Sequence, residues 1–432
     1  MICENLSVRE DGQLLFAGQD TAALAKAYGT PLYLMDEDRI RERCRTYISA
    51  VRSAFGKNAR VLYASKAASF KRMYAIMAEE GLYVDVVSPG EIATACYAGF
   101  PMNRVFYHSS HKSDEDIACA MFSGVGCFIV DNTEELLAVQ ERAALLGRMQ
   151  RIVLRLTPGI DPHTYEAVAT GKVDSKFGFA IETGAADEVT RLALDQPNLV
   201  LEGFHCHVGS QVVDSTVFLQ SVDAMLAFMA SAREKYGYTA RFLDLGGGYG
   251  VRYREEDPAV DIAASIAEIG AYFREKLAAY GLPMPVVAFE PGRSIVADAG
   301  LTLYTVSSVK RIPGYKNYVS VDGGMTDNPR YALYKAPYTV VAAGKMNEPA
   351  ELICSVVGRC CESGDIIQEN VPLPETVARG DLIAVMTTGA YNYSMASNYN
   401  RIPRPPVVML REGSASVAVR RETLDDLVAL DM

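Results

Sequence analysis

Short apolar runs alternate with longer amphipathic segments between about residues 60 and 290. Eight of these runs are rich in Val, Leu, Ile and Phe, and their apolar residues are continuous instead of alternating with polar ones. This pattern is typical of parallel strands that are buried on both faces. The predicted strands are VLYAS (61–65), YVDVVS (83–88), VFYHSS (105–110), FIVDN (128–132), RIVLRL (151–156), VLEGFHCHV (200–208), FLDLGGG (242–248) and VVAFEPG (286–292).

The segments between these runs have the spacing of amphipathic helices. Asn132 and Thr133 can cap a helix whose first turn is acidic. Ile262, Ile266 and Ile269 recur at helical spacing further along the chain. Eight strands that alternate with helices predict an α/β protein with a (β/α)8 TIM barrel. An open, doubly wound sheet is the alternative, but eight strands in about 230 residues fit a barrel better.

The chain changes character after about residue 295. Apolar segments now follow one another with turn residues between them and few helical periods, which predicts a β-rich domain, barrel-like or sandwich-like. The first residues of the chain are not obviously part of the barrel. We therefore predict a barrel over residues 36–293 and a β domain built from residues 1–35 and 294–432. The long polar loop at 157–180 follows a predicted barrel strand, which makes it a functional candidate.

Composition narrows the possible partners and the compartment. The chain has 42 Lys and Arg against 53 Asp and Glu, a net charge of −11, which argues against nucleic acid or an anionic membrane as a partner. A local basic site for a small anion remains possible. We find no signal peptide pattern and no apolar run of the roughly 18 residues that a membrane span needs. Nine scattered cysteines without a CxxC pair indicate reduced thiols and a cytoplasmic location.

Polar residues gather where the predicted barrel strands end. In barrels of this type, active sites lie at the carboxyl ends of the strands. The set contains one lysine, several acids, several imidazoles and a glycine-rich turn, without the ligand spacing of a metal site, so we predict no metal. Its members are Lys66, Asp85, Glu91, His108, Arg155, His205, His207, Gly246–Gly248, Glu290 and Arg293.

Each of these residues has both a chemical and a plainer interpretation. Lys66 can become a nucleophilic amine if a crowded barrel mouth desolvates it, or it can be a solvated surface lysine. The glycines of DLGGGYG (244–250) let backbone N–H groups approach a phosphate, although many glycine turns do nothing more than turn. His207, followed by Ser210, offers a ring to stack on an aromatic cofactor and a hydroxyl for phosphate. Alternatively, its imidazole is satisfied internally.

Glu290 and Arg293 follow the eighth strand. Glu290 can pair with a heterocyclic nitrogen and Arg293 can bind a carboxylate through two hydrogen bonds, or the two can form a structural ion pair. Neighbouring cysteines in a β domain are usually inert, so Cys361 matters only if this domain contributes to an active site. The candidates in the β domain are Arg330, Tyr334, Cys361, Glu362 and Tyr391.

Taken together, the motifs resemble those of the alanine-racemase-like (fold type III) pyridoxal-phosphate decarboxylases, and within them the diaminopimelate decarboxylases. The resemblance covers nearly the whole chain. Single motifs are weak, but this many in the expected order are specific. They are YASKA, DVVSPGE, SKFG, HCHVGSQ, DLGGGYG, EPGRS, DGGMTDNPRYALY, CESGD and GAYNYSMASNYN. The family's fold, a (β/α)8 barrel followed by a β domain, agrees with the pattern of apolar runs.

The resemblance implies pyridoxal 5'-phosphate as the cofactor and assigns roles motif by motif. Lys66 would carry the cofactor as a Schiff base, and Cys361 would be the proton donor at the active site of the partner subunit in a homodimer. Asp85, His207, Ser210, Gly246, Gly247, Gly248, Glu290, Gly292, Arg293 and Tyr391 would bind the cofactor. Arg293, Arg330, Tyr334, Glu362 and Tyr391 would bind the substrate. Glu91 and Arg155 match further active-site positions.

The implied reaction is decarboxylation of meso-2,6-diaminopimelate to L-lysine and CO2, the last step of lysine biosynthesis. This substrate carries a distal ammonium and a distal carboxylate, which two arginines and Glu362 suit, because a buried carboxylate without a cation is costly. A related decarboxylase for ornithine, lysine, arginine or carboxynorspermidine is the alternative. A cofactor-binding protein without catalysis is disfavoured by the joint presence of Lys66, Glu290 and Cys361. A racemase is disfavoured by Glu290, because related racemases have an arginine there.

Overall fold

The computed structural model describes residues 2–160 and 175–432. They form two compact units. One consists of Met1–Glu42, Val251–Pro258 and Arg293–Met432, and the other of Arg43–Gly250 and Ala259–Gly292. The predicted domain boundaries remain a prediction, and unlike this division they assign residues 36–42, 251–258 and 293 to the barrel. The central part of the candidate loop at 157–180 lies outside the described residues.

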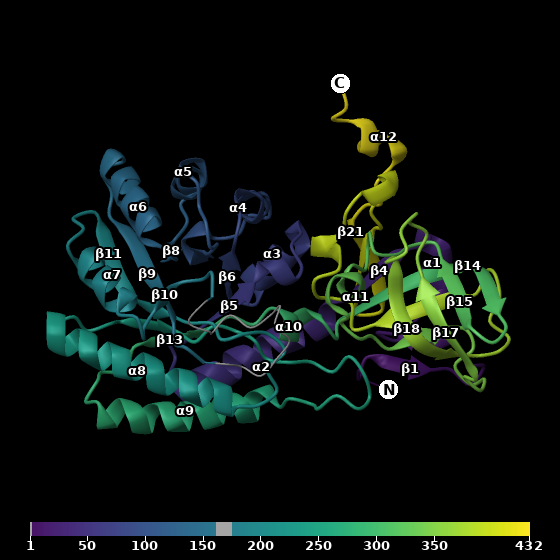
Figure 1. Cartoon of the computed structure of the whole chain (residues 1–432), viewed down its shortest axis with the longest axis horizontal. Coiled ribbons are helices and arrows are strands. Elements are labelled where there is room, and N and C mark those ends of the chain that lie inside the picture. The colour runs from purple at the N-terminus through teal and green to yellow at the C-terminus, as the bar shows by residue number, and fades with distance from the viewer. Residues whose placement is uncertain (1, 161–174) are drawn as a thin grey trace. The chain divides into compact units, whose positions relative to one another are not determined.

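The second unit is a closed parallel barrel (Figure 1). Each strand pairs in parallel with the next, and the last pairs with the first. The eight predicted strands and the (β/α)8 class are therefore confirmed. The strands are β5 (Arg60–Ala64), β6 (Tyr83–Val86), β7 (Val105–Tyr107), β8 (Cys127–Val130), β9 (Gln150–Thr157), β11 (Leu199–His205), β12 (Phe242–Asp244) and β13 (Val286–Phe289). A further short strand, β10 (Phe179–Ala180), pairs with β9.

Apolar side chains fill the inside of the barrel. Leu62, Phe106, Val153 and Phe242 belong to one buried cluster, in which the rings of Phe106 and Phe242 stack with centroids 5.5 Å apart. Each fully buried side chain of this kind contributes about 1.5–3 kcal/mol. The apolar cluster gives way to polar side chains at the carboxyl ends of the strands.

Helices alternate with the strands, and Figure 1 shows them along the outside of the barrel. Asn132 caps α6 by accepting the N–H of Glu135, as predicted. The apolar side of α9 buries Ile262, Ile266 and Ile269, also as predicted. The helices are α2 (Glu37–Phe55), α3 (Lys71–Glu79), α4 (Pro89–Tyr97), α5 (Asp114–Phe122), α6 (Thr133–Leu145), α7 (Ala185–Leu194), α8 (Thr216–Tyr236) and α9 (Ile262–Ala279).

The other unit is rich in β structure, as predicted. Its longest strand, β14 (Gly300–Ile312), pairs with β4 (Leu32–Asp36), β15 (Lys316–Val321) and β19 (Leu382–Met386), so the N-terminal segment is built into this sheet. The sheet continues through β16 (Val340–Ala342), β17 (Leu352–Val357), β18 (Ile366–Leu373), β20 (Val407–Arg411) and β21 (Ser414–Val419). Strands β1 (Leu6–Val8), β2 (Leu14–Phe16) and β3 (Gln19–Asp20) form a separate small sheet. The helices of this β-rich unit are α1 (Thr21–Tyr28), α10 (Arg293–Val296), α11 (Arg330–Tyr334) and α12 (Leu424–Val428).

None of the helices in the described part of the chain has the length and apolar character needed to cross a membrane.

Candidate active site

The carboxyl ends of the barrel strands bring the predicted polar residues to one face. Lys66 lies in a single 3-10 turn directly after β5, and Asp85 is the third residue of β6. His205 ends β11, and Glu290 follows β13. Because parallel strands of a closed barrel end on the same face, these side chains converge although the sequence separates them widely.

Two imidazoles hold the carboxylate of Glu290, which is 7% exposed. His108 Nε2 lies 2.7 Å from its Oε1, and His205 Nε2 lies 3.0 Å from its Oε2. Burial opposes ionisation of Glu290, but the two histidines outweigh it and keep its pKa well below the usual range. Burial lowers the pKa of His205 to about 4, so His205 holds the carboxylate as a neutral hydrogen-bond donor at pH 7. Glu290 is therefore an anion at neutral pH.

His108 and His205 were noted in the sequence as strand-end residues but were given no role. Together with Glu290 they place three potential metal-ligand atoms within 4.8 Å of one another. Nε2 of each imidazole already lies within 3.0 Å of the carboxylate, so the three groups contact one another. The absence of a metal remains a prediction.

The glycine turn after β12 leaves no room for side chains. A Cβ on Gly247 would come within 2.0 Å of the carbonyl oxygen of Glu290, and one on Gly248 within 2.3 Å of that of Gly209. Gly246 has φ +70°. The N–H of Gly247 donates to His207 Nδ1 over 3.3 Å, so a neutral His207 carries its proton on Nε2. The turn therefore sets the tautomer of the histidine beside it.

Burial lowers the pKa of His207 well below its usual value, and the charge of Lys66 acts in the same direction. His207 is thus a neutral, half-buried ring, as a residue that stacks on an aromatic ligand should be. Ser210 follows on the same loop and is also half-buried.

The carboxylate of Glu91 anchors the turn that carries Lys66. Ser65 Oγ and the N–H of Val87 donate to the same carboxylate oxygen of Glu91, over 2.8 and 2.7 Å. A Cβ on Gly292 would lie 3.0 Å from the Cβ of Ala64, so a side chain there would crowd this strand end. Lys66 itself is exposed in the described structure.

Two buried carboxylate oxygens on this face have no hydrogen-bond partner in the described structure. Oδ1 of Asp85 and Oδ1 of Asp131 have none among the described residues. Burial raises the pKa of Asp85, while the charges of His108 and Lys66 oppose that rise. Buried polar atoms are normally satisfied, so unsatisfied ones at a strand-end face indicate a place that a ligand completes. An exposed lysine, a neutral imidazole, a buried carboxylate and a glycine cradle fit pyridoxal phosphate.

The β-rich unit contains a second polar group, which we term the arginine–tyrosine cluster. It consists of Tyr253, Arg293, Arg330, Tyr334, Tyr338 and Tyr391. Arg330 is 4% exposed, and its guanidinium donates to Tyr334 over 3.0 Å and to Tyr338 over 2.6 Å. Arg293 donates to Tyr253 over 2.6 Å and lies 4.8 Å from the ring centroid of Tyr391.

Arg330 has only phenols as hydrogen-bond partners among the described residues, and none of their carboxylates pairs with it. A buried cation without an acid is costly unless an anion completes it. Tyr391 has φ +62°, an uncommon backbone conformation for a tyrosine that often marks a functional position. The cluster therefore has the features of an anion-binding site.

Sequence reasoning found four members of the cluster and missed Tyr253 and Tyr338. Tyr253 lies three residues beyond the segment 244–250 that contains the glycine turn, and Tyr338 lies four residues beyond Tyr334. Their proximity to known candidates was the only signal, and it does not distinguish a contact from a coincidence.

Cys361 and Glu362 lie on an exposed turn between β17 and β18. Asp365 fixes this turn by accepting the N–H groups of Met325 and Cys360, over 2.6 and 2.7 Å. Within the described structure, the carboxylate of Glu362 accepts only from its neighbours Ser363 and Gly364. The single chain therefore presents this thiol and this carboxylate on its surface and does not bring them into the arginine–tyrosine cluster.

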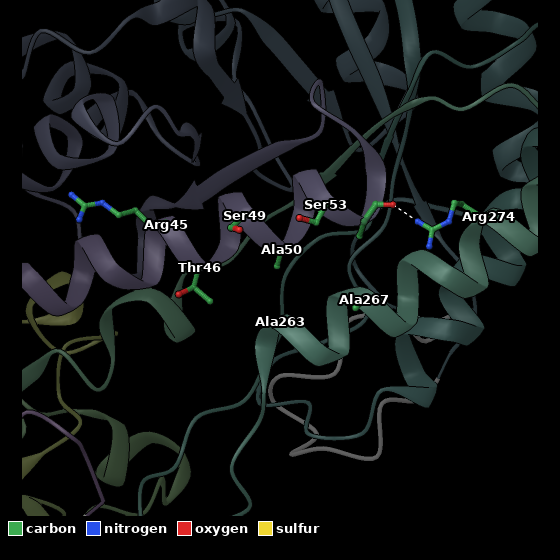
Figure 2. Close-up of a pocket in the computed structure, with 9 residues that line it drawn as sticks. Arg45, Thr46, Ser49, Ala50, Ser53, Ala263, Ala267 and Arg274 are labelled. Carbon is green, nitrogen blue, oxygen red and sulfur yellow. Dashed lines mark hydrogen bonds between the residues drawn. The ribbon is translucent and has the colours of Figure 1, made fainter.

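A pocket of about 630 Å³ lies on the outside of the barrel and contains none of the predicted site residues. Figure 2 shows Arg45, Ser49 and Ser53 of α2 opposite Ala263, Ala267 and Arg274 of α9. Arg45 is already paired with Glu80, and Arg274 donates to the carbonyl oxygen of Ala54. The lining of the pocket has serine and threonine hydroxyls but no carboxylate or imidazole that could activate one of them.

Comparison with known proteins defines the class. Residues 37–297 match the family of the pyridoxal-dependent decarboxylases, in its pyridoxal binding domain. The chain is therefore a pyridoxal-phosphate-dependent decarboxylase, and the predicted cofactor is confirmed.

The more similar relatives define the family within that class. The chain is 44% identical to the diaminopimelate decarboxylase of Bacillus subtilis over 98% of this chain and 96% of the relative. It is 38% identical to that of Staphylococcus aureus, with 98% of both chains covered. A solved diaminopimelate decarboxylase of M. jannaschii in complex with L-lysine superposes with a TM-score of 0.91 at 31% identity, covering 100% of this chain and 98% of that one. The chain belongs to the diaminopimelate decarboxylase family.

Proposed function

We propose that this protein decarboxylates meso-2,6-diaminopimelate to L-lysine and CO2. The observation that carries the proposal is the buried guanidinium of Arg330, which has phenol partners but no carboxylate in the described structure. A substrate with a second carboxylate would supply the missing anion. The family membership and the L-lysine complex of the solved relative agree with this choice.

In this proposal the strand-end residues of the barrel bind the cofactor. Lys66 would provide the amine that attaches it, His207 would support its ring, and Glu290 would supply a negative charge to pair with the ring nitrogen. Asp85, Ser210, Gly246–Gly248, Gly292, Arg293 and Tyr391 complete the binding set. When bound, pyridoxal phosphate supplies an electron sink for the charge left as CO2 departs. The anionic state of Glu290 favours a protonated ring nitrogen and so strengthens that sink.

The arginine–tyrosine cluster binds the far end of the substrate. Arg293 and Arg330, with Tyr334 and Tyr391, would take the distal carboxylate, because a guanidinium offers it two parallel hydrogen bonds. Glu362 would take the distal ammonium. Cys361 would donate the proton that replaces CO2.

We further propose a homodimer in which Cys361 and Glu362 act at the site of the partner. The exposure of this turn in the single chain supports the proposal. A cytoplasmic location is proposed from the nine cysteines, which are all free in the structure.

The alternative within the same class is a decarboxylase of ornithine, lysine or another basic amino acid. A lysine/ornithine decarboxylase of Vibrio vulnificus complexed with putrescine superposes with a TM-score of 0.75 at 26% identity, covering 90% of this chain and 97% of that one. Such substrates have no second carboxylate for Arg330.

Release of CO2 over a panel of amino acids, with pyridoxal phosphate added, tests the proposal. We expect meso-diaminopimelate to have the highest kcat/KM by at least about a hundredfold, the scale of discrimination that a buried charge provides. Preferred turnover of ornithine, lysine or arginine would reject the proposal.

A further inference from the structure

Tyr253 lies between the two arginines of the arginine–tyrosine cluster. Its side chain is 3% exposed, and its phenol oxygen accepts a hydrogen bond from Arg293 Nη1 over 2.6 Å. Its ring lies under the other guanidinium, with Arg330 Cζ 4.8 Å from the ring centroid. One side chain therefore contacts both cations, through the oxygen on one side and the π face on the other.

The backbone of Tyr253 is held independently of its phenol. Its carbonyl oxygen accepts from the N–H and the hydroxyl of Thr339, over 3.1 and 2.8 Å, and its N–H donates to Asp257 Oδ2 over 3.0 Å. Replacement of the hydroxyl alone should leave this loop in place. The phenol oxygen is thus separable from the packing of the ring.

Tyr338 contacts both Tyr253 and Arg330 within the cluster. Its ring meets that of Tyr253 edge-on with centroids 5.4 Å apart, and its oxygen accepts from Arg330 Nη1 and from Asn392 Nδ2. The two phenols therefore fix one guanidinium each and also pack against each other.

Two buried guanidiniums in one cluster repel each other while no ligand is bound. Burial raises the pKa of Tyr253, but Arg293 and Arg330 outweigh it and bring the pKa below the usual value for a tyrosine. This direction agrees with the geometry, because negative charge on the phenol oxygen is stabilised between two cations.

We propose that Tyr253 is a positioning residue that holds Arg293 and Arg330 as one pair for the distal carboxylate of the substrate. The inference rests on the proposed function, since it assigns the pair to that carboxylate. Tyr253 does not touch the reacting bond in this account. It prepares two guanidiniums, which repel each other, to receive one anion.

The test compares wild type with Tyr253→Phe, which removes only the hydroxyl. With meso-diaminopimelate as substrate, KM should rise about tenfold or more while kcat stays within about threefold, because binding and not chemistry is affected. Tyr318→Phe, a tyrosine of β15 with a lysine near its ring and outside the cluster, is the matched control and should match wild type.

Ligand binding gives a second readout that needs no turnover. L-lysine and cadaverine are the same diamine with and without one carboxylate. By calorimetry on the cofactor-loaded protein, Tyr253→Phe should weaken L-lysine about tenfold and leave cadaverine within about twofold. A merely structural role would weaken both ligands alike.

Equal losses for the two ligands, or wild-type KM and wild-type affinity for L-lysine, would overturn the inference. If Tyr253→Phe does not fold, as judged by its melting temperature, Tyr338→Phe tests the same arginine–tyrosine cluster. It should likewise weaken L-lysine while leaving the affinity for cadaverine nearly unchanged. If wild type releases no CO2 from meso-diaminopimelate, the proposed function fails, whereas the selective loss of L-lysine binding still decides the role of Tyr253.

Discussion

The barrel and the β-rich unit differ in how their buried charged groups are paired. In the barrel, Glu290 has an imidazole close to each carboxylate oxygen, so its charge is stabilised before any ligand arrives. In the β-rich unit, Arg330 is surrounded by phenols and has no acid partner in the described structure. The first arrangement suits a group that must stay fixed and charged beside a cofactor. The second suits a group whose counter-ion comes with the substrate.

The largest expected effect comes from Lys66, on the barrel side of this comparison. Lys66→Ala should lower kcat/KM at least about a thousandfold and remove the visible absorbance of the bound cofactor, because the substitution removes the amine to which the cofactor is proposed to attach. Lys71→Ala, an exposed lysine of α3, is the control and should keep both. Retained colour and activity in Lys66→Ala would reject the assigned lysine.

The next effect tests the other side of the comparison. Arg330→Met should raise KM for meso-diaminopimelate by about a hundredfold, because the distal carboxylate loses its buried cation. The free energy of unfolding of the ligand-free protein should fall by less than about 1 kcal/mol, because the substitution also removes an uncompensated charge. Urea denaturation with steady-state kinetics measures both.

The control for that experiment is Arg379→Met, an exposed arginine that should change neither quantity. A severe loss of stability in Arg330→Met, with KM unchanged, would show that this arginine is structural and that the contrast between the units is wrong.

A third prediction asks whether a single chain holds a complete site. Inactive Lys66→Ala and Cys361→Ala proteins, mixed in equal amounts and allowed to exchange subunits, should recover about a quarter of wild-type activity. Half of the dimers would be mixed, and each would contain one intact site of two. Cys96→Ala, another exposed cysteine, should be active by itself. No recovery after confirmed exchange would argue against shared sites.

The smallest effect concerns pH and the neutral state of His205. Its pKa is about 4 in the folded protein against about 6.5 when unfolded, so the unfolded chain binds an extra proton between these values. The free energy of unfolding of the cofactor-free protein should therefore fall as the pH is lowered from 6.5 to 4, with a contribution of up to about 3 kcal/mol from this group.

His205→Gln should show a shallower loss over that interval, whereas His111→Gln, at an exposed position, should follow wild type. Identical slopes for wild type and His205→Gln would mean that His205 is already charged in the folded protein. The carboxylate of Glu290 would then be stabilised by an ion pair with a charged His205.

Much of the barrel could be predicted because its strands are buried on both faces and leave continuous apolar runs. The predicted strands extend too far at their carboxyl ends: the run at 200–208 stops as a strand at His205, and that at 242–248 stops at Asp244. The reason is physical, because the residues beyond these points turn away to build the ligand face. The glycines of the DLGGGYG motif, which mark this site in the sequence, also lie where strand β12 ends.

The arginine–tyrosine cluster could be predicted only in part. Tyr253, Arg293 and Tyr338 come from three separate segments, and each has an ordinary explanation within its own segment. The hydrogen bond from Arg293 to Tyr253 depends on tertiary packing, for which local periodicity carries no signal. The imidazole pair on Glu290 was missed for the same reason, since β7, β11 and β13 meet only when the barrel closes.

The most direct test of the central claim is a stoichiometric assay of the purified protein with meso-diaminopimelate and pyridoxal phosphate. The account predicts one L-lysine for each CO2 released, with no product from the Lys66→Ala protein under the same conditions. Absence of L-lysine, or faster CO2 release from ornithine or lysine than from meso-diaminopimelate, would contradict it.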